Sequence, residues 1–140
     1  MIHAISSLSP VAILVVALVG FGLGTLWYSQ FLFARAWMEE MKLTPESIKA
    51  SAGRVPLLMS GAVLCTIVST FTLAALVAAH RCAGPLKGAE LGLFVAAGLV
   101  AAREGTNALF ECRSLRHFLI VSGHDVALCT VQGALLAVWH

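Results

Sequence analysis

The chain has 140 residues, enough for one domain, and 59% of them are hydrophobic while only 11% are charged. Soluble domains average about 25% charged residues, so this composition excludes a water-soluble fold, because too few polar side chains remain to cover its surface. The formal net charge of +2 and the absence of a basic cluster give no indication of nucleic-acid binding. The expected surroundings are therefore a lipid bilayer.

The first predicted membrane span covers about residues 10–33. It lies within residues 4–34, a run without a charged side chain that is longer than the roughly 20 residues needed to cross a bilayer. Pro10 suits the first turn of a helix and Ser9 suits its cap. The run is about twice as long as the hydrophobic region of a signal peptide and lacks a basic region before it, so we expect it to be retained.

Aromatic side chains gather where this span ends, in the segment GTLWYSQFLFARAW at residues 24–37. Trp and Tyr rings favour the headgroup level of a bilayer, where an apolar ring and a polar tip are both accommodated. We therefore expect half of an aromatic belt at the membrane surface, formed by Trp27, Tyr28, Phe33 and Trp37. An aromatic wall for a ligand is the alternative interpretation.

A short helix lying on the membrane is expected after the belt, because Trp37, Met38 and Met41 recur at helical spacing. The following letters LTPES predict a second short turn over residues 47–52, with Thr44 as its cap and Pro45 at its first position.

Three further spans are predicted over about residues 56–79, 85–110 and 117–139. In the third, only residues 91–102 are free of charge, so Lys87 and Glu90 must reach one membrane surface while Arg103 and Glu104 lie within the other end. The expected fold is an all-α integral membrane four-helix bundle, a single domain over residues 1–140, with a short interfacial helix between spans one and two.

Loop charges predict the orientation. Seven of the nine Lys and Arg residues fall in the first and third loops, and the other two, Arg81 and Lys87, fall in the second. Because basic residues favour the cytoplasmic side, the first and third loops are expected there and both termini on the opposite side.

Glycines at four-residue spacing predict close helix packing. Gly20 and Gly24 form such a pair on span one, and Gly88 and Gly92 form another on span three. Small residues let helix backbones approach each other within lipid. The pattern fits packing within one chain and packing between subunits.

Asp125 is the most unusual residue of span four, because it falls near the middle of the membrane. A central Asp costs roughly 2.5–3.5 kcal/mol on insertion scales, so it should face the bundle and have a partner. Counting from the turn between spans three and four places Arg103 at a similar depth. We expect either an Arg103–Asp125 clamp between the two helices or a proton or ion relay through Asp125 and His124.

Further polar residues of the last two spans complete a candidate cluster. Glu104, Asn107 and Glu111 share one helical face, His117 and His124 share another, and Arg113 lies at the turn between the spans. We expect an interhelical hydrogen-bond network. A metal site is not expected, because no pair of residues has the ligand spacing typical of helical bundles, and no cofactor is expected.

Two segments resemble a known family. GTLWYSQFLFARAWMEEM and TNALFECRSLRHFLIVSG are similar to the signature of a bacterial family of small membrane proteins, the domain of unknown function 1761 family. The resemblance implies four spans, a place in the bacterial cytoplasmic (inner) membrane and no established activity. Two departures are Ala34, where the family tends to have Gly, and His124–Asp125, where an aromatic residue followed by His is expected. The matching positions are Gly24, Trp27, Tyr28, Ser29, Phe33, Trp37, Met38, Asn107, Phe110, Glu111 and Gly123.

Three functional classes are compatible with these features. The first, which the sequence favours, is a non-enzymatic membrane protein that associates with itself or serves as a subunit of a larger membrane complex. The second is a proton or small-solute transporter or channel subunit that uses Asp125. The third is a membrane enzyme acting on a lipophilic substrate through the cluster of residues 103–113.

Overall fold

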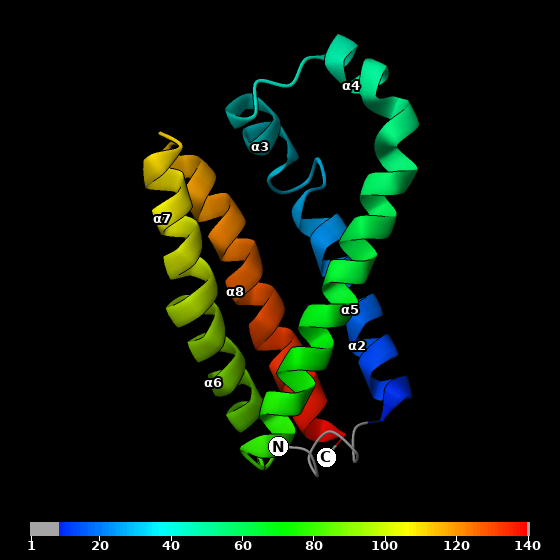
Figure 1. The fold of residues 1–140 in the computed structure, drawn as a ribbon, viewed down its shortest axis with the longest axis vertical. Helices are drawn as coiled ribbons and strands as arrows, with labels where there is room; N and C mark the ends of the chain where they lie inside the picture. Colours follow the sequence, from blue (N-terminus) through cyan, green and yellow to red (C-terminus); the bar gives the residue numbers. More distant parts are fainter. Residues whose placement is uncertain (1–8, 140) are drawn as a thin grey trace.

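The computed structural model describes residues 9–139, and in that range it contains helices and no strands (Figure 1). Four helical stretches run back and forth between the two ends of the molecule, and each is long and apolar enough to cross a bilayer. The expected all-α four-helix membrane architecture is confirmed. The stretches are α2 (Pro10–Trp27), α5 (Val55–Ala79), α6 to α7 (Pro85–Phe110) and α8 (Leu115–Val138).

The first stretch begins at the residues expected and ends earlier. The Ser9 hydroxyl accepts a hydrogen bond from the Ala12 N–H, and Pro10 occupies the first turn. The helix ends at Trp27, and the chain then turns through residues 28–33, closed by a bond from the Phe33 N–H to the Trp27 carbonyl. This turn brings the aromatic segment back over the end of α2.

Two short helices follow, where a short helix and then a second turn capped by Thr44 were expected. These are α3 (Ala34–Glu40) and α4 (Pro45–Ser51). The Thr44 and Ser47 side chains each bond the other residue's backbone N–H in a capping box, which fixes the start of α4. A 3₁₀ turn, η1 (Ala52–Arg54), then continues directly into α5.

The third stretch changes its helical form halfway. It consists of α6 (Pro85–Val95), a π-helical turn η2 (Ala96–Ala101) and α7 (Ala102–Phe110). A π turn adds a residue to the helical repeat, so α7 presents its side chains in directions that a continuous α-helix would not.

Helices α6 and α8 make the closest contact in the bundle, and Figure 1 shows them side by side. A Cβ atom at Gly88 would collide with the Gly133 carbonyl, and one at Gly92 would collide with the Cys129 carbonyl. The backbones of the two helices therefore touch, as small residues permit in membrane bundles. The glycine pattern on this helix packs within the chain.

The apolar core lies in the half of the bundle where α2 begins and α5 ends. The most deeply buried core residue of each helix is Val16 in α2, Val77 in α5 and Leu136 in α8. In the other half α5 diverges from α8 (Figure 1), and its residues 55–65 are all exposed. The space left between α2, α5 and α8 in that half holds the candidate site.

Candidate functional site

The aromatic segment at the end of α2 folds back onto α8. The Trp27 Nε1–H donates a 3.1 Å hydrogen bond to the Ile120 carbonyl, and the Trp27 and Phe33 ring centroids lie 4.7 Å apart. Gly123 gives the indole room, since a Cβ there would stand 3.3 Å from the Trp27 ring. Trp27 and Phe33 thus fasten α2 to α8, whereas Phe31 is 93% exposed. The expected place of these rings at a membrane surface stays a prediction.

The other two aromatic residues of the predicted belt pack against one another. The Tyr28 and Trp37 ring centroids lie 5.7 Å apart, edge to face, and both side chains are half-buried. This contact joins the end of α2 to α3. Of the four belt residues only Tyr28 lines the candidate cavity, so the aromatic wall stays a prediction.

His124 lies where α2 meets α8. Its side chain is only 15% exposed, and its ring centroid is 5.3 Å from that of Tyr28 and 6.1 Å from that of Trp27. Gly24 makes this approach possible, because a Cβ there would stand 3.3 Å from His124 Nε2. The glycine expected to bring two helices together here makes room for an imidazole.

The two nitrogens of His124 have different surroundings. Nδ1 lies 2.9 Å from Oδ1 of Asp125, whereas Nε2 is buried and has no hydrogen-bond partner in the described part of the chain. A buried polar atom without a partner costs about 1–3 kcal/mol. The imidazole is therefore held at one nitrogen and lacks a hydrogen-bond partner at the other among the described residues.

The expected ion pair between Arg103 and Asp125 does not form. Arg103 is exposed on α7, and no ion pair of this residue occurs within residues 9–139. Counting from the hairpin turn gives the depth of a residue but not its direction, and η2 changes that direction for α7. The neighbouring His124 takes the place expected for Arg103.

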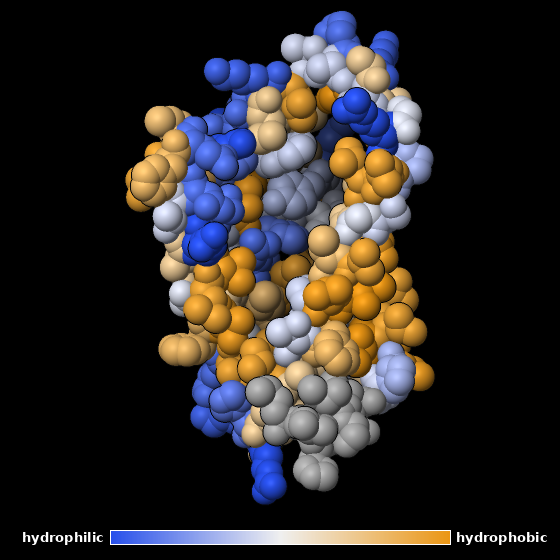
Figure 2. Space-filling view, in the orientation of Figure 1, coloured by the Kyte–Doolittle hydropathy of each residue, from blue (hydrophilic) through white to orange (hydrophobic). Residues whose placement is uncertain are grey.

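A largely apolar cavity of about 280 Å³ lies between α2, α5 and α8, with the His124 imidazole in its wall. Figure 2 shows a hollow on this face, between α5 and the pair formed by α7 and α8, with hydrophilic residues at its floor. The Thr25 and Thr66 hydroxyls in the wall donate to carbonyls of their own helices. The residues lining the cavity are Gly20, Phe21, Gly24, Thr25, Tyr28, Met59, Ala62, Thr66, His124 and Leu128.

A second apolar cavity of about 190 Å³ lies between α2 and α5 and shares Phe21 and Thr66 with the first. Leu18, which lines it, is 70% exposed, and Met59 of the first cavity is 46% exposed. The mouths of both cavities therefore face the side of the bundle, where acyl chains lie in a bilayer.

The remaining residues of the predicted cluster are not gathered into one network. Asn107 and Glu111 are exposed, and the Glu111 carboxylate pairs with Arg113 Nε at 2.8 Å, two residues further on. Glu104 is half-buried, and it and Asp125 both lie within electrostatic range of the Tyr28 hydroxyl. Glu104 of α7 thus acts electrostatically on Tyr28, a residue that lines the cavity.

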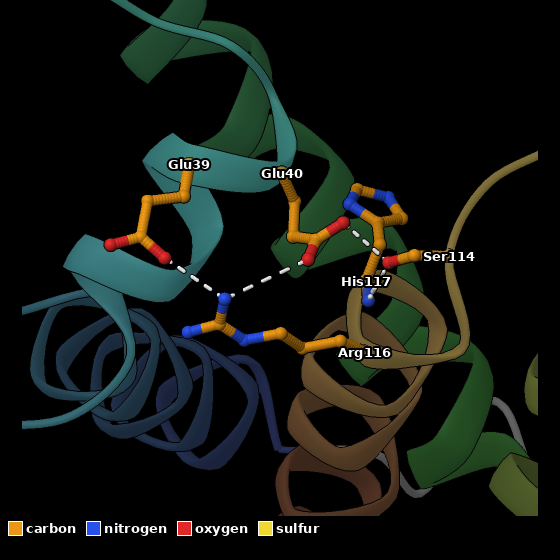
Figure 3. A network of polar contacts seen from close by, with 5 residues as sticks. All are labelled: Glu39, Glu40, Ser114, Arg116 and His117. Carbon is orange, nitrogen blue, oxygen red and sulfur yellow. Dashed lines mark hydrogen bonds and ion pairs between the residues drawn. The ribbon is translucent and has the colours of Figure 1, made fainter.

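His117 belongs to a different set of contacts, between α3 and the start of α8 (Figure 3). Arg116 Nη1 lies 2.9 Å from Glu39 and 3.8 Å from Glu40, while the Ser114 hydroxyl donates to Glu40 and caps α8 at the His117 N–H. Figure 3 shows the His117 imidazole, which is 6% exposed, beside the Glu40 carboxylate. Glu39 and Glu40 were not predicted from the sequence, because adjacent acidic residues are common in any solvated loop.

A buried hydrogen bond between α8 and α5 was not predicted either. Gln132 Nε2 donates to the Thr70 hydroxyl at 2.8 Å, and both residues are at most 1% exposed. Gly20 of α2 faces this amide, and a Cβ there would collide with it. A lone Gln in a hydrophobic span was the one signal for this contact, since an intramembrane polar group requires a partner.

Comparison with protein-family models matches residues 11–137 to the family described as "Protein of unknown function (DUF1761)". The chain belongs to this family. Comparisons with curated proteins and with solved structures give no match. The two segments that carry the DUF1761 resemblance meet in the structure, because Trp27 of the first contacts Ile120 and Gly123 of the second.

Metal-ligating side chains are dispersed in this DUF1761 member. Among residues 9–139, no three His, Cys, Asp or Glu side chains converge as the ligands of a metal ion would. The four cysteines are all free thiols, Cys65, Cys82, Cys112 and Cys129. The feature with the clearest chemical capacity is therefore the His124 imidazole and the cavity beside it.

Proposed function

We propose that this protein binds a small lipophilic molecule, taken up from the bilayer, in the cavity between α2, α5 and α8. The observation that carries the proposal is the His124 imidazole, which lines an apolar cavity of about 280 Å³ and whose buried Nε2 lacks a partner among the described residues. Small-molecule sites typically combine apolar walls with a few polar groups that fix orientation. An engineered apolar cavity of roughly 150 Å³ already holds benzene, so the space suffices for a substituted ring.

The proposed setting is the bacterial inner membrane, with the α3–α4 segment and the α7–α8 turn on the cytoplasmic side. Both lie at the same end of the bundle, and both loops are rich in Lys and Arg. The cavity then lies toward the cytoplasmic half of the bilayer and opens sideways to lipid.

Native mass spectrometry of the protein released from nanodiscs tests the proposal, because it detects a retained small molecule directly. Ala62→Phe places a ring in the cavity wall and should abolish retention. Leu64→Phe is the matched control, because Leu64 is 62% exposed on the same helix and lines neither cavity between α2 and α5. Retention that is absent from the unmodified protein, or unchanged in Ala62→Phe, would contradict the proposal.

Self-association, or assembly into a larger membrane complex, stays a prediction that one feature favours. Residues 55–65 of α5 are exposed on every face, although this part of the helix lies beside the cavity. A second copy packed on this half of α5 would close the mouth of the cavity. The same mass spectra report the subunit number, and a monomer under all conditions would contradict the prediction.

A further inference from the structure

We propose that His124 and Asp125 together accept a hydrogen bond from a hydroxyl group, so that the cavity selects an apolar phenol or alcohol over the corresponding ether. This inference rests on the proposed function, because it names the chemical class of the molecule that the cavity binds.

The chemistry of the pair sets the direction of the bond. An ionised Asp125 carboxylate has only acceptor sites, and with it the 2.9 Å contact between Asp125 Oδ1 and His124 Nδ1 requires a proton on Nδ1. A neutral imidazole with a proton on Nδ1 carries a lone pair on Nε2. Nε2 is the buried atom without a partner in the described chain, so the group that completes it must donate.

None of the other described side chains that line the cavity donates a hydrogen bond to His124 Nε2. The Thr25 and Thr66 hydroxyls donate to backbone carbonyls of their own helices, at 2.9 Å in each case. The Tyr28 ring stands beside the imidazole, and no hydrogen bond joins the two within the described residues. The proposal assigns this donor to a molecule bound in the cavity that His124 lines.

The shape of the space indicates the rest of the molecule. Aromatic rings of Phe21 and Tyr28 line the first cavity, and the second cavity continues from Phe21 along α2 and α5 with apolar walls. A ring with its hydroxyl at His124 would occupy the first cavity, and a hydrocarbon chain on the ring would extend into the second. The chemical class is thus a hydroxyl-bearing amphiphile soluble in the bilayer.

The test uses the intact protein in nanodiscs and three probes that differ in one group: 4-hexylphenol, 4-hexylanisole and hexylbenzene. Binding is measured by titration and corrected for partition into empty nanodiscs. We expect the phenol to bind about tenfold more tightly than the anisole, as one neutral hydrogen bond provides. In protein labelled with ¹⁵N-histidine, His124 should carry its proton on Nδ1, and only the phenol should shift the Nε2 resonance.

Variants distinguish the contribution of the His124–Asp125 pair to binding from that of the apolar cavity. Asp125→Leu removes the acceptor at Nδ1, so the imidazole proton is no longer held there and the preference for the phenol should be lost. His124→Phe should lose the same preference while hexylbenzene still binds. Glu104→Gln is the matched control, since it removes a nearby carboxylate that is not bonded to the imidazole, and it should keep the preference.

The outcomes distinguish this inference from the proposed function. Equal binding of the three probes would overturn the inference and leave a lipophilic site in place. Binding of none of them would overturn both. A proton on Nε2 of His124 in the unmodified protein, or an undiminished phenol preference in Asp125→Leu, would overturn the assigned direction of the hydrogen bond.

Discussion

Single residues set the distance between α6 and α8. At Gly92 the neighbouring backbone of Cys129 occupies the place that a side chain would take. At Gly22 of α2, by contrast, an added Cβ would have no neighbouring atom within 4 Å. Both glycines lie inside transmembrane helices, so a change to Ala has the same effect on helix propensity at each. The two positions differ in the space around them. They form a matched pair for measuring what the close contact contributes.

We predict that Gly92→Ala destabilises the protein by about 1–3 kcal/mol, because the added methyl group must push two backbones apart. Gly22→Ala should be neutral or stabilising by up to about 1 kcal/mol, since Ala is the better helix former. Equilibrium unfolding in detergent micelles measures both changes. Equal effects of the two substitutions would show that the α6–α8 contact does not depend on Gly92.

The Gln132–Thr70 hydrogen bond gives a second prediction for single residues. Thr70→Val should cost about 1–3 kcal/mol, because it leaves the buried Gln132 amide without its acceptor. Adding Gln132→Leu should recover part of that loss, with a coupling energy of about 0.6–1.7 kcal/mol in the double-mutant cycle. Thr72→Val is the control, since Thr72 is exposed and bonds only its own helix. Additive effects of the two buried substitutions would contradict the prediction.

Among the elements, α3 depends most on polar contacts. It has seven residues, of which only Ala34 is buried, and Arg116 of α8 holds its last turn through Glu39 and Glu40. Exposed ion pairs contribute only about 0–1 kcal/mol, so these contacts position α3 more than they stabilise the bundle. The start of α8 and the end of α2 are joined through this short helix.

We therefore predict that Arg116→Gln increases amide hydrogen exchange in residues 34–40 severalfold and leaves the global unfolding free energy within about 1 kcal/mol. Arg103→Gln should leave exchange in α3 unchanged, because Arg103 is exposed and has no ion pair in the described part of the chain. Hydrogen exchange followed by mass spectrometry measures both variants. If hydrogen exchange in α3 is unchanged in Arg116→Gln, the ion pairs of Arg116 do not hold α3 in place.

The sequence predicted the elements better than their partners. The spans and the Thr44 cap follow from local features, namely apolar length and capping chemistry, so they were accessible without a structure. Asp125 was expected to need a partner, and it has one, but the partner is His124 rather than Arg103. The depth of a residue in the membrane follows from its position along one helix. The direction in which its side chain points depends also on η2 and on the turn after Trp27. Neither deviation leaves a distinctive sequence pattern.

At the level of the whole molecule, the bundle is tightly packed at one end and open at the other. The core around Val16, Val77 and Leu136 closes the end where α2 begins, and the divergence of α5 leaves the cavity toward the opposite end. This arrangement places His124 inside the bundle, at a depth that lipid surrounds. The site therefore depends on the chain crossing the bilayer four times.

The most direct test of this topology is labelling of single-cysteine variants with a membrane-impermeant maleimide in intact bacterial spheroplasts and in inverted vesicles. We expect Ser9→Cys, Cys82 and Val138→Cys to react from the outer face, and Glu46→Cys and Cys112 to react only from the cytoplasmic face. These positions mark successive ends of the four helical stretches. Reaction of Cys82 and Cys112 from the same side would contradict the four-span fold and, with it, the placement of His124 within the membrane.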